Sequence, residues 1–251
     1  MARLLIAGLL FTHLLLLSSR FVTVAAAAPA ARAGGETTLA ILYFDYSGHD
    51  ASLEALRKGL TQMLISDLAA ADNLRVVERE RLQAVLEEHK LAKSGKIDAA
   101  TAARVGKLLG ARYLVLGSYF DALGAFRVDA RLVDVETGEV VKSIGANGKA
   151  DDFLALEQSL AEGLRQAASK LAAAPPGRAA AGSPSPAAGA ERRVTLKLPK
   201  RLKTETALDY GRALVAMDDG DRKTAQTLFR KVLSAQPDFG LAQRDLGRLM
   251  Q

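Results

Sequence analysis

The sequence of 251 residues contains no cysteine. An exported protein without cysteine has no disulfide bonds, no metal–thiolate site and no amino-terminal cysteine to carry lipid. The sequence also lacks the patterns GxSxG, HExxH, GxxxxGKS/T and GxGxxG followed by an acid. Those patterns place a nucleophile, zinc ligands or a phosphate cradle at set spacings. We therefore expect no catalytic residue, no cofactor and no metal.

The first 33 residues are predicted to be a secretory signal peptide. Arg3 is followed by an apolar stretch and then by small residues that end at Ala33, which is the layout of a signal sequence. Arg20 divides the apolar stretch into pieces shorter than the ~20 residues that a membrane-spanning helix needs. A retained membrane anchor is the alternative. We expect cleavage between Ala33 and Gly34, which yields a periplasmic protein that is exported and not lipidated.

The charge of the chain gives little support for nucleic-acid binding. The net charge is +6, and removal of residues 1–33 takes away three arginines and no acid, which lowers it to +3. Most remaining basic residues have acidic neighbours, as in the run Glu78-Arg79-Glu80-Arg81, which is typical of a solvated helical face. We expect no nucleic-acid partner.

Composition divides the mature chain into two structured parts. Between residues 172 and 191 no apolar side chain is larger than alanine apart from those of four prolines, so this stretch cannot bury enough surface to offset its ordering entropy. We predict a core-forming domain at 37–172, an Ala/Pro-rich linker with a basic end at 173–203 and a small helical module at 204–251. The basic residues within 192–203 are interpreted as a linker end with a short docking strand; the alternative is peripheral contact with an anionic surface.

The first half of the domain has the pattern of a strand and its covering helix. Residues 39–44 are a continuous apolar run, as expected of a strand buried on both faces. Large apolar residues and alanine then recur at helical spacing over 53–71. A second short strand at 74–78 leads into another helix with Leu82 on its apolar side.

The second half of the domain predicts an antiparallel meander and a final helix. A helix with Asp98 as N-cap and Gly110 after its end precedes alternating residues at 126–132. Residues 136–139 read as a hairpin turn, and Asp151 or Asp152 caps the last helix. The order β-α-β-α-α-β-β-β-α predicts a mixed sheet of about five strands covered by helices, in the α/β (α+β) class.

One loop is a weak candidate for a ligand site. It contains Asp45, Ser47, His49 and Asp50 and follows the first strand, at the carboxyl edge where ligands often bind to α/β sheets. The same residue types are ordinary turn formers. We interpret the loop as a turn and keep a catalytic or metal site as the alternative.

Residues 204–251 resemble a tetratricopeptide repeat. The matching positions are Ala213, Gly220, Ala225, Phe229 and Pro237. Small residues let two antiparallel helices approach, and the phenylalanine fills the gap toward the next repeat. The pattern departs at Asp209 and Arg212, where large apolar residues are usual. Because about three repeats are normally needed for stability, we expect this tail to dock on the first domain, self-associate or receive a partner's helix.

Three sequence blocks occur in the order found in one envelope family. They are residues 76–82, 105–118 and 130–141. They resemble the CsgG-like family of curli secretion channels and the related amino-terminal domain of TolB. The resemblance covers about residues 38–172 and implies a role in the bacterial cell envelope through protein contacts.

The function implied by the resemblance is a non-enzymatic periplasmic scaffold or accessory subunit for assembly of an envelope machine. Its expected partners are envelope proteins, through which it would associate with the outer membrane. Self-association through the tail is a further expected contact. A subunit of an oligomeric outer-membrane secretion pore is the alternative. Curli channels insert two long amphipathic hairpins into this domain, whereas the connections in this sequence are short. A hydrolase is the least supported function.

Overall fold

The computed structural model describes residues 36–91, 99–122, 124–149, 152–173 and 198–251. The expected cleavage position at Ala33 and Gly34, the expected cap Asp98 and most of the expected linker lie outside these ranges. Within them, every helix falls short of the length or the apolar character that a membrane span requires. Residues 34–251 constitute one compact unit.

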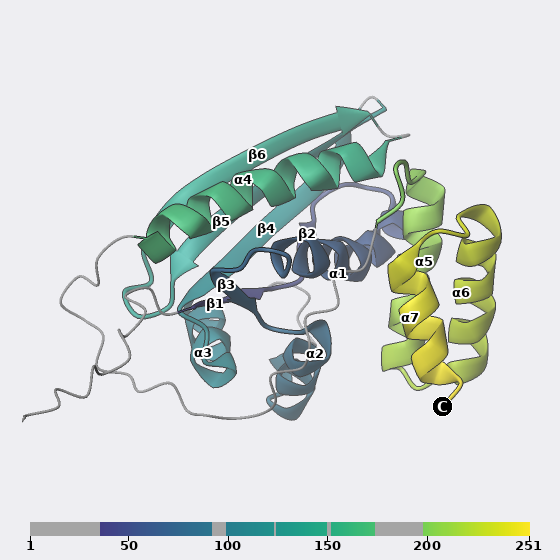
Figure 1. The fold of residues 1–251 in the computed structure, drawn as a ribbon, viewed down its shortest axis with the longest axis horizontal. Helices are drawn as coiled ribbons and strands as arrows, with labels where there is room; N and C mark the ends of the chain where they lie inside the picture. The colour runs from purple at the N-terminus through teal and green to yellow at the C-terminus, as the bar shows by residue number, and fades with distance from the viewer. Residues whose placement is uncertain (1–35, 92–98, 123, 150–151, 174–197) are drawn as a thin grey trace, which may run out of the picture. The chain divides into compact units, whose positions relative to one another are not determined.

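A mixed sheet of six strands forms the centre of the fold (Figure 1). The strands are β1 (Thr37–Ile41), β2 (Asp45–Tyr46), β3 (Leu74–Val76), β4 (Tyr113–Ala122), β5 (Ala125–Asp134) and β6 (Val140–Lys149). Their order is β3-β1-β4-β5-β6, and β2 pairs with β4. β1 is parallel to β3 and β4, whereas β4, β5 and β6 form an antiparallel meander. The predicted α/β class is confirmed, with one more strand than expected because the chain re-enters the sheet at β2.

Helices cover both faces of the sheet (Figure 1). They are η1 (Ala51–Ala55), α1 (Leu56–Leu68), α2 (Arg79–Glu88), α3 (Ala99–Leu109) and α4 (Phe153–Ala173). The alternation along β1 sends Leu39 and Ile41 into an apolar cluster with α1 and α4. It sends Ala40 into a second cluster with α2 and α3. Burial on both faces explains why residues 39–44 are continuously apolar.

Turn and cap residues act where the sequence predicts them. Gly110 follows α3 with φ +66°, and Gly138 lies in the β5–β6 turn with φ +74°, a conformation that glycine adopts without a steric penalty. The Asp152 carboxylate accepts a hydrogen bond from the Ala155 N–H at 3.3 Å, so Asp152 caps α4. The alternation in β5 gives that strand an exposed side and a buried side.

The tail consists of three helices that share the first domain's core. They are α5 (Thr204–Asp218), α6 (Arg222–Ala235) and α7 (Gly240–Leu249). Ala207 and Leu214 of α5 are fully buried in the same apolar cluster as Leu56 and Leu60 of α1. Among the three expected arrangements, the tail therefore adopts docking on its own first domain.

Candidate protein-binding site

The predicted loop residues serve the local structure in different ways. Asp45 lies in β2, and its carboxylate is 3.3 Å from the Arg57 guanidinium. Asp50 caps η1 by accepting from the Ser52 N–H at 2.9 Å, and hydrogen bonding first with the Ser52 side chain and then with its N–H lowers the pKa of the Asp50 carboxyl. The Ser47 N–H donates to the main chain of β4, and His49 is exposed. Within the described ranges, no group of three or more His, Cys, Asp or Glu residues is placed to hold a metal. A ligand role for this loop stays a prediction.

The five predicted packing residues of the tail lie in and around one helical hairpin. Ala213 of α5 and Ala225 and Phe229 of α6 are fully buried. Gly220 forms the turn between the two helices with φ +78°. Pro237 is exposed, and its carbonyl accepts from the Gln243 side chain at 2.6 Å. These positions agree with the hairpin that the sequence predicts, whereas a true tetratricopeptide repeat stays a prediction.

Asp209, where the sequence departs from the repeat pattern, forms ion pairs. Asp209 is 4% exposed, and its carboxylate lies 2.7 Å from Lys231 of α6 and 3.4 Å from Arg212. An ion pair between α5 and α6 thus replaces the apolar contact that the repeat pattern expects at this position.

Close helix contact joins the tail to the first domain. Gly211 of α5 lies against the main chain at Ala55, and Gly59 of α1 faces Gly211 in return. A β-carbon added at Gly211 would overlap the Ala55 carbonyl oxygen. The two glycines therefore let the helix backbones approach more closely than side chains would permit.

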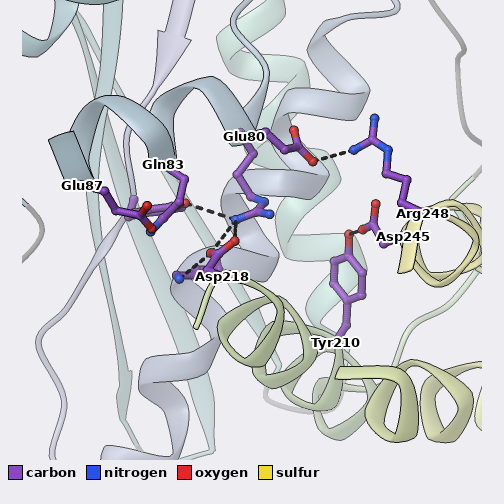
Figure 2. A network of polar contacts seen from close by, with 10 residues as sticks. Glu80, Gln83, Glu87, Tyr210, Asp218, Asp245 and Arg248 are labelled. Carbon is purple, nitrogen blue, oxygen red and sulfur yellow. Dashed lines mark hydrogen bonds and ion pairs between the residues drawn. The ribbon is translucent and has the colours of Figure 1, made fainter. Parts of the chain in front are cut away.

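A buried ion pair anchors the end of α5 between α1 and α2 (Figure 2). The Asp218 carboxylate accepts hydrogen bonds from Arg79 of α2 at 2.7 and 2.9 Å and from Lys58 of α1 at 2.5 Å. Arg79 is 1% exposed. The prediction of a solvated helical face for residues 78–81 is therefore wrong at Arg79, although Arg81 is exposed. Removal of one partner would leave an uncompensated buried charge and would strongly destabilise the docked arrangement.

Further polar contacts surround the anchor. Tyr43 donates to the Gln83 side-chain oxygen at 2.7 Å, and burial raises the pKa of the Tyr43 hydroxyl. Figure 2 shows Glu80 of α2 facing Arg248 of α7, with 2.6 Å between the charged groups. In the same view Tyr210 and Asp245 meet inside the tail, joined by a hydrogen bond of 2.8 Å. Of these three contacts, the Glu80–Arg248 pair runs between the tail and α2, whereas the other two lie within the first domain and within the tail.

An open groove of about 890 Å³ lies where the tail meets the first domain. The residues around η1, α1 and α2 form one wall, and the α5–α6 hairpin forms the other. The apolar part of the lining includes Leu86, Leu91, Val215 and Leu228. Because Ala51 and Ser52 also line it, the groove begins just after the loop that the sequence singled out.

The basic segment before α5 is held by its apolar residues. Pro199 and Leu202 are buried, and Leu198 packs against the main core. Lys200 and Arg201 are exposed. The described part, 198–203, therefore docks on the domain without forming a strand, while residues 192–197 lie outside the described ranges.

The sequence did not predict either contact that joins the tail to the first domain, the ion pair at Asp218 or the close approach at Gly211. Arg79 stands in an alternating charge run, and Asp218 stands in a run of acids before a turn. Both patterns are typical of exposed residues. The only sequence signal for the junction is the pair of helical glycines, Gly59 and Gly211, at positions where glycine lowers helix propensity.

Comparison with solved structures gives distant likenesses. The LpoB C-terminal domain from Escherichia coli is 18% identical, with 49% of this chain and 87% of that chain covered and a TM-score of 0.39. A PelC dodecamer from Paraburkholderia phytofirmans is 13% identical, with 53% and 88% covered and a TM-score of 0.33. TolB from Acinetobacter baumannii is 14% identical, with 56% and 29% covered and a TM-score of 0.29.

Comparison by sequence gives one family. None of the curated proteins compared with the chain matches it. Residues 38–122, which extend from β1 to the end of β4, match the family model described as "Curli production assembly/transport component CsgG". This match covers less than half of the chain. The similarity to the CsgG family is therefore stated for the first part of the sheet domain alone.

Proposed function

We propose that the protein is a non-enzymatic periplasmic scaffold or accessory subunit for the assembly of a bacterial cell-envelope machine. The match of residues 38–122 to a curli assembly and transport family supports the envelope setting. The observation that carries the protein-contact role is the docked tail, which forms one wall of an open groove beside the sheet domain. The sheet domain binds an envelope component, and the tail recruits a second protein.

The α5–α6 hairpin has a surface that is free for such recruitment. Ala225, Phe229 and Val232 of α6 face the core, whereas Thr227 and Arg230 are exposed. One side of the helix therefore holds the hairpin together while the other faces outward. A partner that binds this side depends on correct packing of the buried side.

Capture of partners from native cell envelopes by crosslinking tests the proposal. In Ala225→Arg, a charged side chain enters the closed α5–α6 contact, where overpacking and desolvation together cost several kcal/mol. We expect this variant to lose its envelope partner. Ala235→Arg makes the same change at an exposed position of α6, and we expect it to retain the partner.

Thermal melting of both variants accompanies the capture experiment. The sheet domain should remain folded in each, because Ala225 lies in α6 and not in the α5 contact with α1. Equal partner capture by wild type and Ala225→Arg would show that the tail is not the recruiting surface. The loop around Asp45–Asp50 would then become the candidate for the recruiting surface.

A secretion-pore subunit is the second candidate, because the matching family model describes a transport component as well as an assembly component. The two functions predict different assemblies. A pore subunit forms detergent-resistant rings in membrane extracts, and a scaffold or accessory subunit is recovered with its partner. Size-exclusion chromatography and electron microscopy of native extracts distinguish them.

A further inference from the structure

We infer that the outer edge of β6 binds an extended segment of a partner protein as an additional strand. The segment is uncharged where it faces residues 143–148 and carries an acidic residue at each end. This inference rests on the proposed function, in which the sheet domain binds an envelope component, and it specifies the chemistry of that component. Addition of a strand to an exposed sheet edge is a recurrent way to bind an extended peptide.

β6 is the long open edge of the sheet (Figure 1). The sheet ends with β3 on one side and β6 on the other, and β3 has three residues whereas β6 has ten. Within the part of the chain that the structure describes, β6 pairs with β5 alone. Half of the main-chain groups of a strand point away from its one neighbour. β6 therefore presents a row of N–H and C=O groups that an added strand can pair with.

Residues 143–148 are the part of this edge that is regular enough to accept a strand. The pairing with β5 shifts register between Val140 and Lys142, so Val141 is an extra residue in a bulge. A bulge interrupts the ladder and bends the strand. After the bulge, the register with β5 continues without a break to Lys149. Residues 143–148 have the sequence Ser-Ile-Gly-Ala-Asn-Gly, which contains neither charge nor proline.

Lys142 and Lys149 flank this segment with positive charge. Both are exposed, and neither forms an ion pair with another described residue. At the first end, Arg131 of β5 is a further exposed cation and lies directly opposite Ser143. Glu139, in the turn before β6, is the acid at this end. Two cations and one acid leave the first end positive.

The second end of the segment has the same excess of positive charge. Lys149 and the exposed Arg201 lie around one small pocket with Asp152. The Asp152 carboxylate already accepts a hydrogen bond from the first turn of α4. Two further charged pairs beside the segment are satisfied internally, Arg127 with Asp129 in β5 and Arg165 with Glu162 in α4. The two flanking lysines are therefore the charges that an added strand meets.

The flanking lysines disfavour a second copy of β6 as the occupant. Antiparallel pairing of residues 143–148 from two copies sets Lys142 of each opposite Lys149 of the other. Like charges directly opposite each other are destabilising, and lysine on an edge strand acts against self-pairing. The chain's own residues 192–197 carry three cations and no acid, so the lysines repel them in the same way. A foreign strand with an acid at each end turns both repulsions into attractions.

The alternation of β6 sets the remaining pattern of the partner. Ile144 and Ala146 face α4 and pack in or against the main core. Ser143, Gly145 and Asn147 are exposed on the other side. Because an added strand continues the alternation of its neighbour, the partner should carry apolar residues on the α4 side and polar residues on the exposed side.

Synthetic peptides test this chemistry with the full chain. The first probe is fluorescein-labelled Glu-Val-Thr-Val-Thr-Val-Thr-Glu with blocked ends, which places every valine on the α4 side in antiparallel alignment. The second probe has lysine in place of both glutamates. The third has proline at its two central positions, one of which must direct its missing N–H at β6. By fluorescence anisotropy at physiological salt, the first peptide should bind at least about tenfold more tightly than either of the others.

A charge reversal in the protein tests the role of the lysines. Lys142→Glu combined with Lys149→Glu should weaken the Glu-ended peptide by about tenfold and should make the Lys-ended peptide the preferred one. Lys107→Glu combined with Lys223→Glu is the matched control, because both residues are exposed and lie in α3 and α6. The control should bind like wild type. All four positions are exposed, and melting curves check that both variants are folded.

Amide exchange locates the added strand. The Glu-ended peptide should slow exchange within residues 143–148 and leave exchange in α6 unchanged. If these amides are already as protected in the free chain as those of β5, the edge is occupied by a second copy or by the chain itself, and the inference is overturned. Gel filtration of the free chain then distinguishes these two occupants.

The outcomes separate this inference from the proposed function. Equal affinity for the Lys-ended peptide or for the proline peptide would overturn the edge assignment. If the chain captures an envelope partner, no peptide binds and the charge reversal leaves capture unchanged, the scaffold stands and the edge assignment falls. If the Glu-ended peptide binds at residues 143–148 but the native chain captures no envelope partner, the scaffold falls and the edge chemistry stands.

Discussion

Gly211 of α5 lies so close to the Ala55 carbonyl that any side chain at this position would overlap the main chain of the first domain. The contact is between two helical segments more than 150 residues apart in sequence. It gives a direct way to separate the folding of the tail from its docking. A substitution at Gly211 affects the junction first, because the neighbouring atoms belong to a helix backbone that is unable to move aside.

We expect Gly211→Ala to weaken docking by about 1–3 kcal/mol, the usual range for overpacking a tight contact. The same change favours the isolated helix, because alanine exceeds glycine in helix propensity by ~1 kcal/mol. Gly247→Ala is the matched control, since a β-carbon there meets nothing within 4 Å. Urea unfolding should show a loss for the first variant and a gain for the second. A gain in both would mean that this contact does not hold the tail.

The ion pair at Asp218 should be far more important for stability than the exposed pair between Glu80 and Arg248. Asp218→Asn leaves the buried Arg79 and nearby Lys58 without a carboxylate, at a cost of about 3–5 kcal/mol. Glu80→Gln should cost less than about 1 kcal/mol. Replacing both buried partners, in Arg79→Met with Asp218→Leu, should recover much of the loss. Chemical denaturation of the three variants measures these differences.

Glu157 predicts a pH dependence of stability. It is fully buried in α4, and neither carboxylate oxygen has a hydrogen-bond partner among the described residues. Burial, and then the nearby Asp67, raise the pKa of Glu157 well above its usual value. Burial raises the pKa of Asp67 to about 6.

Both folded-state pKa values are raised, so the folded protein holds these protons more tightly than the unfolded chain. The stabilisation is fully present below the unfolded pKa values near 4 and declines as pH rises through about 6 and beyond. Glu157→Leu removes the buried acid and should raise the melting temperature at pH 8 by several degrees, with a smaller gain at pH 5. Melting temperatures of both proteins across pH 4.5–8 measure the effect. A gain that is the same at every pH would contradict this account.

Limited proteolysis should cut first within residues 173–191, whose composition predicts a linker. Because α5 shares its core with α1, the two fragments should stay associated after cleavage. Gel filtration of the cut protein should give one peak that contains both. In Gly211→Ala the fragments should elute separately to a larger extent. Cleavage within 39–146 before the linker would place the domain boundary elsewhere.

Local periodicity was sufficient to predict most of the fold. The continuous run at 39–44 predicted burial on both faces, and the alternation at 126–132 predicted the one-sided strand β5. Gly110 and Gly138 marked a helix end and a hairpin turn because both need positive φ. The short strand β2 was not foreseen, since a two-residue element has no period to detect.

The candidate site was much less predictable because long-range contacts form it. Arg79 has the neighbours of an exposed residue and is buried only because α5 supplies Asp218. Glu157 lies on the buried face of α4 beside Phe153 and Leu160. That face was identified from its apolar residues, so the burial of an acid within it was not predicted. The groove depends on the tail's position, for which the sequence offers only the weak signal of the two helical glycines, Gly59 and Gly211.

Asp218 joins Lys58 and Arg79, which belong to helices on opposite faces of the sheet. A single carboxylate thus links the α1 layer to the α2 layer by ion pairs at the place where the two helices come close to each other. Removing α5 from its seat takes away this link and leaves a guanidinium in an apolar site. Undocking of α5 would therefore loosen α2, and amide exchange in that helix would report whether the tail is docked.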